Sequence, residues 1–464
     1  MSVALRDYQH EAVTAALAAL DKGQHPVLAL PTGAGKGLVI GELCRQLADK
    51  RILVATHRKE LLEQNEAALL RLGVHAHEAG VYSAGLERRE RHARVIFGGI
   101  QSIYARMDML QQAGKFDVVI VDEAHAIGYR GTDKDKESAM YHRVFTACPN
   151  ASRVGLSATP YRLSEGLIYG PDPSHWFDIL AYEIGMQPLI QAGYLAPLRG
   201  ILTAANMPTD GVHIRQGDFV SKELSQRACE ESIVTAAAEE LCRLGANRQS
   251  WIVFCCDVAH TEVMAAALTE RGIVCGVVTQ KTTPEERKRV VDGARDGSIR
   301  ALVNCLVFTT GFDVPRIDLI ADLQPTQSKS RCVQKYGRGS RLSPETGKQD
   351  CVVIDLASNL ERHKPLDGLP EALTEKTPAR QARDKKCEEE ETEKRKRDAQ
   401  WNHGDTASLE DPFGNPIAKH LTVHTVSYAV VPSRSRGVNN LVATYECVTD
   451  HEIRRVIKQW ICIE

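Results

Sequence analysis

Short apolar runs alternate with amphipathic stretches through the first third of the chain. The apolar runs are HPVLALPTG, RILVATH, ARVIFGGIQS, FDVVIVDEAH and SRVGLSATP, and each ends in glycine or polar residues. The stretches between them include KGLVIGELCRQLADK and RKELLEQNEAALLRLG, which repeat apolar residues at helical spacing. Buried strands that alternate with helices predict an α/β fold, with a parallel sheet covered on both faces.

The same rhythm returns in the second half of the chain. The strand candidates there are SWIVFCC, GIVCGVVT, ALVNCLVFTTG, DLIADLQ and DCVVIDLA. We therefore expect two tandem α/β domains, residues 1–198 and 246–365, each with a parallel sheet flanked by helices. Residues 199–245 would connect the two domains, and the periodicity of SKELSQRACEESIVTAAAEELCRLG predicts a helix within this connector.

The character of the chain changes after residue 365. Residues 366–415 are dense in charges of both signs and poor in apolar residues, so we expect a charged linker or a solvated helix. Residues 416–464 alternate apolar and polar positions and are rich in β-branched residues, which predicts a small β-rich C-terminal module. Its role is open between a nucleic-acid-binding module and a small domain that docks on the motor or on a partner. The aromatic and basic residues behind this choice are Tyr428, Arg434, Arg436, Tyr445, Arg454, Arg455 and Trp460.

Composition narrows the class of protein. The formal net charge is −2, so a nucleic-acid partner would need a local groove of Lys and Arg rather than a global basic field. The 13 cysteines form no C-x-x-C pair, which favours reduced thiols in a cytoplasmic protein without structural zinc. The N-terminus does not resemble a signal peptide, and no apolar run approaches the ~18 residues that span a bilayer, so we expect no membrane association.

A glycine-rich loop follows the first predicted strand. In LPTGAGKG, Gly35 and Lys36 stand as they do in a phosphate-binding loop, whose usual pattern is Gly, four residues, then Gly-Lys-Ser or Gly-Lys-Thr. Leu30 and Gly37 depart from that pattern, and Gly37 replaces the hydroxyl that normally ligates magnesium. A loop between a strand and a helix can cradle phosphates with backbone N–H groups while Lys36 reaches the β- and γ-phosphates. The loop alone leaves open a working nucleotide site, an impaired one and a chance sequence.

Two acids end the strand VVIVDEAH. Adjacent carboxylates at the end of a buried strand are costly to desolvate unless a cation lies opposite them. Magnesium would fit, with Asp122 holding the ion and Glu123 orienting or deprotonating the attacking water. Taken alone, the same acids could be a solvated strand end.

Two later motifs add candidates for the same chemistry. The segment LSATP follows a predicted strand and carries Ser157 and Thr159. The segment QKYGRGSRL carries Arg338 and Arg341, which three-residue spacing would place on one face of a helix. Such a face is either solvated or, opposite a nucleotide, a source of arginine fingers for a transferring phosphoryl group.

The motifs LRDYQ, PTGAGKG, ATHRKEL, DEAH, SAT, TTGFDVP and QKYGRGSRL, taken in order, resemble those of superfamily-two helicases of the DEAH-box type. The resemblance covers about residues 3–357 and implies two RecA-like domains with an ATP site between them. Within the superfamily, LRDYQHEAV, LPTGAGKGLVIGEL, SATPYRL and LVFTTGFDVPRIDLI resemble bacterial RadD-type repair ATPases and related phage helicases. Those proteins carry a cysteine-rich zinc region near the C-terminus, and this chain has none, so its C-terminal module would have a different role.

The resemblance implies a role for each residue of a site that binds ATP and Mg²⁺. Arg6 and Gln9 would recognise adenine, and His125 would couple the site to the second domain. The expected catalytic residues are Lys36, Asp122, Glu123, His125, Gln334, Arg338 and Arg341, with Asp122 as the magnesium ligand. The expected nucleotide-binding residues are Arg6, Gln9, Pro31, Thr32, Gly33, Ala34, Gly35, Lys36, Gly37, Gly311 and Asp313. Ser157 and Thr159 would couple hydrolysis to domain movement.

Nucleic acid would cross the top of both domains. The residues that match strand-binding motifs are Thr56, Arg58, Gln101, Ser102, Thr279 and Thr310. Their small hydroxyl, amide and basic groups suit phosphate oxygens, so we expect weak sequence preference and strong salt dependence. The expected partner is single-stranded or branched DNA, together with recombination or single-strand-binding proteins.

These observations predict an ATP-dependent helicase or translocase that acts on DNA in repair, recombination or replication. The alternatives are an ATP-gated clamp or remodeller with weak hydrolysis, an RNA helicase, and the motor subunit of a restriction enzyme. The clamp is motivated by Gly37, and the RNA helicase stays open because phosphate contacts alone do not reveal the sugar. A restriction motor is disfavoured because the remaining sequence shows no convincing nuclease constellation. At Gly37 we expect an active ATPase with a raised magnesium requirement, which Gly37→Thr should lower.

Overall fold

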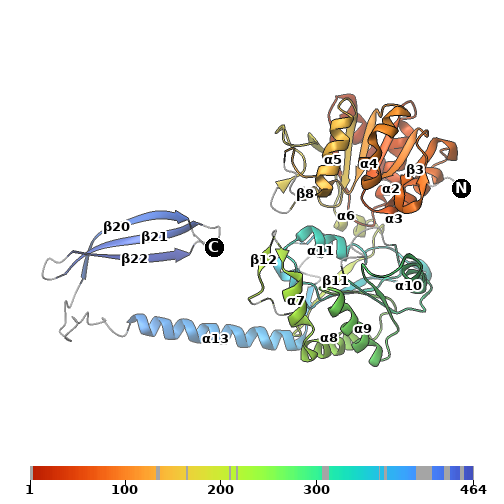
Figure 1. The fold of residues 1–464 in the computed structure, drawn as a ribbon. Coiled ribbons are helices and arrows are strands. Elements are labelled where there is room, and N and C mark those ends of the chain that lie inside the picture. The colour runs from red at the N-terminus through yellow and green to blue at the C-terminus, as the bar shows by residue number, and fades with distance from the viewer. Residues whose placement is uncertain are drawn as a thin grey trace. The chain divides into compact units, whose positions relative to one another are not determined.

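The computed structural model describes residues 4–131, 136–162, 166–207, 209, 211–215, 218–305, 313–364, 366–369, 374–403, 421–432, 439–449 and 454–462. The chain divides into two compact units, residues 1–381 and residues 382–464. Each unit is described by itself. The first unit consists of two lobes, each built on one large sheet (Figure 1).

The sheet of the first lobe has eight strands in the order β10-β1-β7-β6-β2-β5-β3-β4. All neighbouring strands pair in parallel except β3 and β4, which are antiparallel. The strands are β1 (Pro26–Ala29), β2 (Ile52–Thr56), β3 (Ala79–Ser83), β4 (Arg88–Arg89), β5 (Val95–Gly99), β6 (Val118–Asp122), β7 (Ser152–Ser157) and β10 (Ile179–Glu183).

Helices cover both faces of this sheet, as alternate residues of β2 show. Ile52 and Val54 belong to a buried cluster with residues of α1 (Asp7–Asp21), α2 (Lys36–Gln46) and α3 (Lys59–Arg71). Leu53 and Ala55, which point the opposite way, belong to a second cluster with residues of α4 (Ile100–Gln112) and α5 (Lys136–Ala147). A strand buried on both faces explains the uninterrupted apolar runs and confirms the predicted fold class.

The sheet of the second lobe has seven strands, all parallel, in the order β15-β16-β14-β17-β18-β11-β19. Its strands are β11 (Leu198–Leu202), β14 (Trp251–Phe254), β15 (Cys275–Val278), β16 (Ala301–Asn304), β17 (Leu319–Asp322), β18 (Cys351–Asp355) and β19 (Thr374–Lys376). Strand β11 comes from the segment that the sequence suggested as a connector, and it pairs with β18 along its whole length. That segment therefore contributes to the second sheet.

The connector contains two helices where the periodicity predicted one. Helix α7 (Ser221–Ala228) ends at Cys229, and Glu230 is extended before α8 (Glu231–Leu244) begins. The apolar positions of both helices face one core, so the break leaves no mark on the hydrophobic pattern. The remaining helices of the first unit are α6 (Met186–Gln191), α9 (Val258–Glu270), α10 (Pro284–Asp296), α11 (Lys329–Tyr336) and α12 (Asn359–Arg362).

Short elements complete the first unit. Two antiparallel pairs are formed by β8 (Tyr161–Arg162) with β9 (Gly166–Leu167) and by β12 (Ile214–Arg215) with β13 (Asp218–Phe219). Single 3-10 turns are η1 (Ala76–Glu78), η2 (Ala84–Leu86), η3 (Ala124–Ala126) and η4 (Pro344–Thr346). The 3-10 turn η3 directly follows the two acids at the end of β6.

The second unit contains a helix and a small sheet. Helix α13 (Pro378–His403) begins in the first unit, continues into the second and carries the charged sequence expected to be a linker or solvated helix. The antiparallel strands β20 (Leu421–Pro432), β21 (Asn439–Thr449) and β22 (Arg454–Cys462) form one sheet, in agreement with the predicted β-rich module. Within the described ranges, no helix combines the length and apolar character needed to cross a membrane.

Candidate active site

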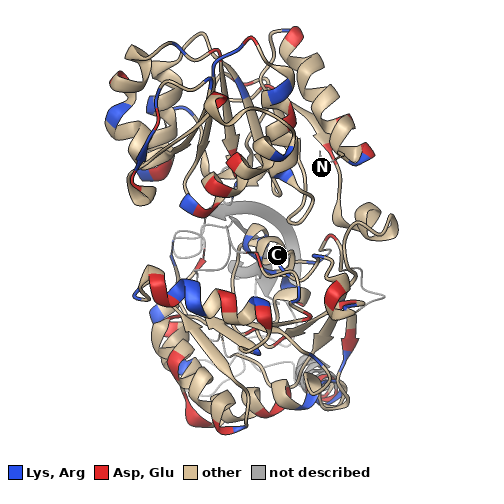
Figure 2. Ribbon diagram, turned by 90° about the vertical axis from the view of Figure 1, so that its right-hand side faces the viewer, with Lys and Arg blue, Asp and Glu red and all other residues tan. Residues whose placement is uncertain are grey.

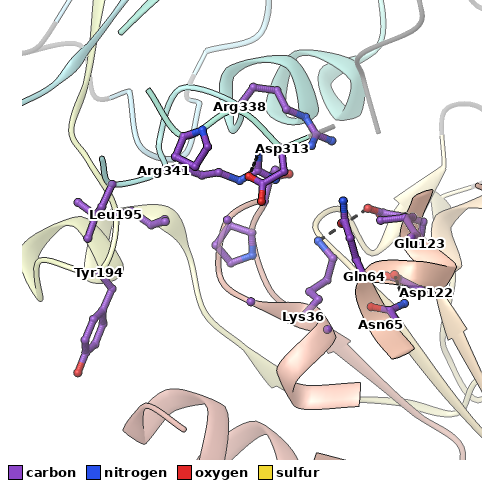
Figure 3. A pocket seen from close by; sticks show the side chains of 18 of the residues that line it. Lys36, Gln64, Asn65, Asp122, Glu123, Tyr194, Leu195, Asp313, Arg338 and Arg341 are labelled. Carbon is purple, nitrogen blue, oxygen red and sulfur yellow. Dashed lines mark hydrogen bonds and ion pairs between the residues drawn. The ribbon is translucent and has the colours of Figure 1, made fainter. Parts of the chain in front are cut away.

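A cavity of about 390 Å³ lies between the two lobes of the first unit. Its size falls within the roughly 300–1,000 Å³ typical of small-molecule sites. Arg338 and Arg341 lie on one side of it, and Lys36, Asp122 and Glu123 lie on the other (Figure 3). The lining residues are Arg6, Pro31, Thr32, Gly33, Gly35, Lys36, Gly37, Leu61, Gln64, Asn65, Asp122, Glu123, Tyr194, Leu195, Asp313, Pro315, Arg338, Arg341 and Leu342.

The glycine-rich loop runs from the end of β1 to the start of α2. Gly35 has a φ of 76°, a left-handed conformation that glycine adopts without strain, and it caps the helix that begins at Lys36. The Lys36 ammonium group lies 3.8 Å from a carboxylate oxygen of Glu123 and 3.5 Å from the carbonyl oxygen of Leu30. The loop therefore presents a helix N-terminus and a lysine to the cavity, which is an arrangement that binds phosphate.

The two acids of VVIVDEAH stand where β6 ends. Asp122 and Glu123 are only 3% and 6% exposed, and Glu123 adopts a φ of 60°, which is strained for a residue with a side chain. The amide of Asn65 donates a hydrogen bond of 3.1 Å to Oδ2 of Asp122. The other Asp122 oxygen, Oδ1, is buried without a hydrogen-bond partner among the described residues.

Their surroundings shift the pKa values of the two acids in opposite directions. Burial, assisted by the charge of Glu123, raises the pKa of Asp122. Burial alone would also raise the pKa of Glu123, but Lys36 and His125 outweigh it and lower that pKa. A divalent cation next to the orphaned Asp122 oxygen would compensate this buried negative charge, so the residues present fit the expected magnesium ion.

Two guanidinium groups, that of the buried Arg338 and that of the partly buried Arg341, line the cavity from the second lobe. Burial, with Arg341 nearby, lowers the pKa of Arg338 to about 9, and burial also lowers the pKa of Arg341. Arg341 lies 3.0 Å from a carboxylate oxygen of Asp313. Two desolvated cations that converge on a cavity favour an anionic ligand there.

The expectation that these arginines share a helix face is wrong. Helix α11 ends at Tyr336, and the backbone continues through tight turns in which Arg338 and Gly339 donate to carbonyl groups three residues earlier. Gly337 and Gly339 are poor helix formers, which explains why the helix stops before the arginines. The turns, rather than a helix, aim both side chains at the cavity.

Side-chain hydrogen bonds near the two acids link the first lobe to the second lobe. Nε2 of His125 lies 3.1 Å from the Gln334 amide, and Nδ1 of His125 lies 3.1 Å from the hydroxyl of Ser157. The hydroxyl groups of Thr159 and Ser330 are 2.7 Å apart. The structure thus brings the predicted coupling residues together, and it adds Ser330, which only its place shortly before QKYGRGSRL could have indicated.

The two residues of the predicted adenine motif, Arg6 and Gln9, lie in different surroundings. Arg6 lines the cavity and lies over the ring of Tyr194, 4.5 Å from its centroid. Gln9 is 2% exposed and donates to the carbonyl oxygen of Ala34, so it braces the phosphate loop and does not line the cavity. Sequence reasoning missed Tyr194 and its neighbour Leu195, which follow α6 and belong to no motif.

The predicted strand-binding residues are placed less uniformly. Thr56 is fully buried at the end of β2, where it pairs in register with Gly99, so it does not contact a strand in this conformation. Arg58 precedes α3, and Thr279 is 8% exposed after β15. Thr310, together with the predicted nucleotide residue Gly311, lies outside the described residues.

Gln101 and Ser102 open onto a second cavity, of about 330 Å³, at the start of α4. Arg89 and Arg106 also line this cavity and add positive charge to it. Elsewhere on the first unit, basic and acidic residues are interspersed over both lobes (Figure 2). Any attraction for a phosphate backbone therefore comes from local groups such as these and not from the net charge.

Two protein-family models match the chain. The model described as "Type III restriction enzyme, res subunit" matches residues 2–162, and the "Helicase conserved C-terminal domain" model matches residues 235–343. The first segment carries Lys36 and the two acids, and the second carries the two arginines. The chain carries both conserved domains of superfamily-two helicases. Members of this superfamily hydrolyse nucleoside triphosphates, and the narrower likeness of this chain to RadD-type repair ATPases stays a prediction.

Relatives of the chain include helicases and restriction subunits. IRC3 of Saccharomyces cerevisiae, assigned as an ATP-dependent helicase, is 27% identical over 76% of this chain and 51% of its own. The 51.5 kDa protein of a Lactococcus phage is 25% identical over 74% of this chain and 66% of its own. The type I restriction enzyme EcoAI endonuclease subunit of Escherichia coli is 24% identical over 80% of this chain and 49% of its own. The chain thus spans about half to two thirds of the length of these relatives.

Solved structures support the same architecture. A fragment assigned as the HsdR subunit of a type I restriction enzyme from Vibrio vulnificus superposes with a TM-score of 0.60 at 21% identity, covering 80% of this chain and 67% of that one. Dbp5 of Saccharomyces cerevisiae, bound to RNA and ADP BeF3, superposes with a TM-score of 0.54 at 14% identity, covering 80% of this chain and 90% of that one. These superpositions show the fold, which is two RecA-like domains in tandem.

Proposed function

We propose that this helicase is an ATP-dependent motor that moves along, or separates, DNA strands. The observation that carries the proposal is one cavity faced by Lys36 and the paired acids from the first lobe and by Arg338 and Arg341 from the second. Neither lobe alone holds all the charges that a triphosphate needs. Binding and hydrolysis of ATP would therefore require both lobes together.

Each group has a task that follows from its position. Backbone N–H groups of the glycine-rich loop and the Lys36 ammonium group bind the β- and γ-phosphates. Glu123, held ionised by Lys36, accepts a hydrogen bond from the attacking water and orients it. Arg338 and Arg341 offset the charge on the transferring phosphoryl group from the opposite side. Magnesium held by Asp122 would neutralise phosphate charge when bound.

Movement would come from the differential contact of ATP with the two lobes. While the γ-phosphate is present, it attracts Lys36 on one side and the arginines on the other, and the cleft is closed. Hydrolysis and release remove that bridge, so closure depends on the remaining contacts, including Gln334 with His125 and Thr159 with Ser330. Strand-binding groups on the two lobes would then shift relative to one another in each cycle.

DNA is the proposed substrate, and a role in repair, recombination or replication is part of the proposal. The relatives support DNA through their names, which include two Escherichia coli restriction subunits and an archaeal DNA translocase. The test is a steady-state ATPase assay with single-stranded, duplex, forked and branched DNA and with matching RNA, each across a salt series. Greater stimulation by RNA than by any DNA would replace the proposal with an RNA helicase.

A nucleotide-gated clamp is the second candidate, and Gly37 favours it. Without a hydroxyl next to Lys36, hydrolysis could be slow while binding persists. DNA retention in ATP, in a non-hydrolysable analogue and without nucleotide separates the two functions. A clamp holds DNA in both ATP and the analogue with little turnover, whereas a motor releases DNA as ATP is consumed.

A further inference from the structure

Gly37 lies next to a buried side chain of the neighbouring helix. A Cβ atom at position 37 would lie 2.9 Å from Oδ1 of Asn65 and 3.6 Å from Cβ of Ala68. The first distance is shorter than a carbon–oxygen contact tolerates. Any side chain at position 37 must therefore push the Asn65 carboxamide away from its present place.

Asn65 has little freedom to move. It lies on α3, is 3% exposed, and has the buried residues Leu62 and Leu69 on the same helix. Its Nδ2 group donates the hydrogen bond to Oδ2 of Asp122. Both Gly37 and Asn65 line the cavity, and Asn65 lies directly beside Asp122 there (Figure 3). Displacing the carboxamide would therefore break the bond that orients the acid.

We propose that Gly37 and Asn65 form one functional unit, in which Asn65 is a positioning residue for the metal site. Its carboxamide fills the space that a Ser or Thr side chain would need and holds the Asp122 carboxylate so that its free oxygen faces the metal. This inference rests on the proposed nucleotide site. It reverses the expectation from the sequence, because a side chain returned to position 37 costs the site its ordered acid.

The test measures the binding of a fluorescent ADP analogue, once in EDTA and once across a magnesium titration. The variants are Gly37→Ala, Gly37→Ser, Asn65→Ala and Asn65→Leu, alone and combined. Leu keeps most of the bulk of Asn65 without its hydrogen bonds, whereas Ala opens the space. Gln112→Ala, at an exposed position of α4, is the control, and the melting temperature of each variant shows that it folds.

The expected pattern is specific to positioning. Asn65→Ala and Gly37→Ala should each raise the magnesium concentration for half-maximal binding by about ten- to hundredfold, the effect of losing a buried hydrogen bond to a charged group. Affinity in EDTA should change less than about twofold, because the loop still binds phosphate. The double Ala variant should need no more magnesium for half-maximal binding than either single variant, since both substitutions remove the same hydrogen bond. The double variant Gly37→Ala/Asn65→Leu should need more magnesium for half-maximal binding than either of its single variants.

Four outcomes would overturn the inference. Gly37→Ser alone could lower the magnesium concentration for half-maximal binding, or Asn65→Ala could leave it unchanged. The effects of the two Ala substitutions could add in the double variant, or nucleotide affinity could fall equally with and without magnesium. The last outcome would show a merely structural role. Failure of the proposed function looks different, because wild-type protein would then bind no nucleotide, or Lys36→Ala would bind it equally well.

Discussion

Nε2 of His125 lies 3.1 Å from the side-chain amide of Gln334, and this contact joins the end of β6 to helix α11 of the other lobe. The same His125 ring reaches Ser157 with its other nitrogen and lies 3.4 Å from Glu123. One imidazole therefore contacts Glu123, Ser157 and the second lobe. This position predicts that His125 reports closure of the cleft to the acid.

Breaking this contact should uncouple hydrolysis from the nucleic acid. In Gln334→Ala and in His125→Ala, we expect DNA to stimulate ATP hydrolysis at least about tenfold less, because closure no longer aligns the site. Affinity for the nucleotide in the absence of DNA should change little. ATPase rates with and without single-stranded DNA measure the effect. Gln349→Ala, at an exposed position of the same lobe, should behave as wild type.

The arginines should matter for turnover more than for binding. Arg338→Ala removes charge that is needed most when the phosphoryl group transfers, so we expect kcat to fall by about 10³-fold or more. Affinity for a non-hydrolysable analogue should fall far less. Arg243→Ala removes an exposed arginine of the same lobe, which pairs with Glu240 on α8, and should leave kcat unchanged. Equal losses of affinity and kcat would show that Arg338 only binds the ground state.

A buried ion pair lies at the C-terminal end of α11. The Lys335 ammonium group lies 2.6 Å from Asp322, both side chains are fully buried, and Asp322 also accepts bonds from Tyr336 and Asn359. Replacing Lys335 with Met leaves the acid without its cation, which should lower the free energy of unfolding by about 3–5 kcal/mol. Chemical denaturation measures this loss. Lys288→Met breaks an exposed pair with Asp292 and should cost less than about 1 kcal/mol.

His260 predicts a pH dependence of stability. Burial lowers its pKa to about 4, and its Nε2 atom has no hydrogen-bond partner among the described residues. Because the folded-state pKa lies below the unfolded value near 6.5, the unfolded chain takes up the proton first. The stabilisation is complete above about pH 6.5 and is lost as the pH falls toward 4, at a cost of about 3 kcal/mol.

His260→Gln should make the unfolding free energy less sensitive to pH between 6.5 and 4. Denaturant titrations at several pH values measure this slope. His10→Gln, at an exposed position of α1, is the matched control and should keep the wild-type slope. An unchanged slope in His260→Gln would show that other groups dominate the acid sensitivity.

The fold could be predicted because its strands are buried on both faces. Uninterrupted runs such as those of β2 and β6 leave few other structures open, and helices between them imply parallel pairing. Strand β11 is different, since its burial alternates and its partner β18 lies about 150 residues away. Only the long-range pairing assigns it to the second sheet, so a local pattern placed it in a connector.

The residues of the candidate site could also be predicted only where a local motif contains them. The phosphate loop and the acids are local motifs with their own chemistry, so the sequence identified Lys36, Asp122 and Glu123. Tyr194 and Asn65 reach the cavity only because separate elements pack around it, and neither belongs to a motif that the sequence analysis used. The departure at Gly37 was visible in the sequence, but its meaning depends on Asn65, which only the packing of α2 against α3 reveals.

The proposed function requires that ATP is hydrolysed in the cavity between the lobes and that nucleic acid stimulates this hydrolysis. The most direct test is steady-state ATP hydrolysis by the wild-type protein and by Lys36→Ala, each with and without single-stranded DNA. DNA should stimulate hydrolysis by the wild-type protein, and Lys36→Ala should lose this activity. Absence of DNA-stimulated hydrolysis, or equal hydrolysis by both proteins, would show that this cavity is not the site of a nucleic-acid-dependent ATPase.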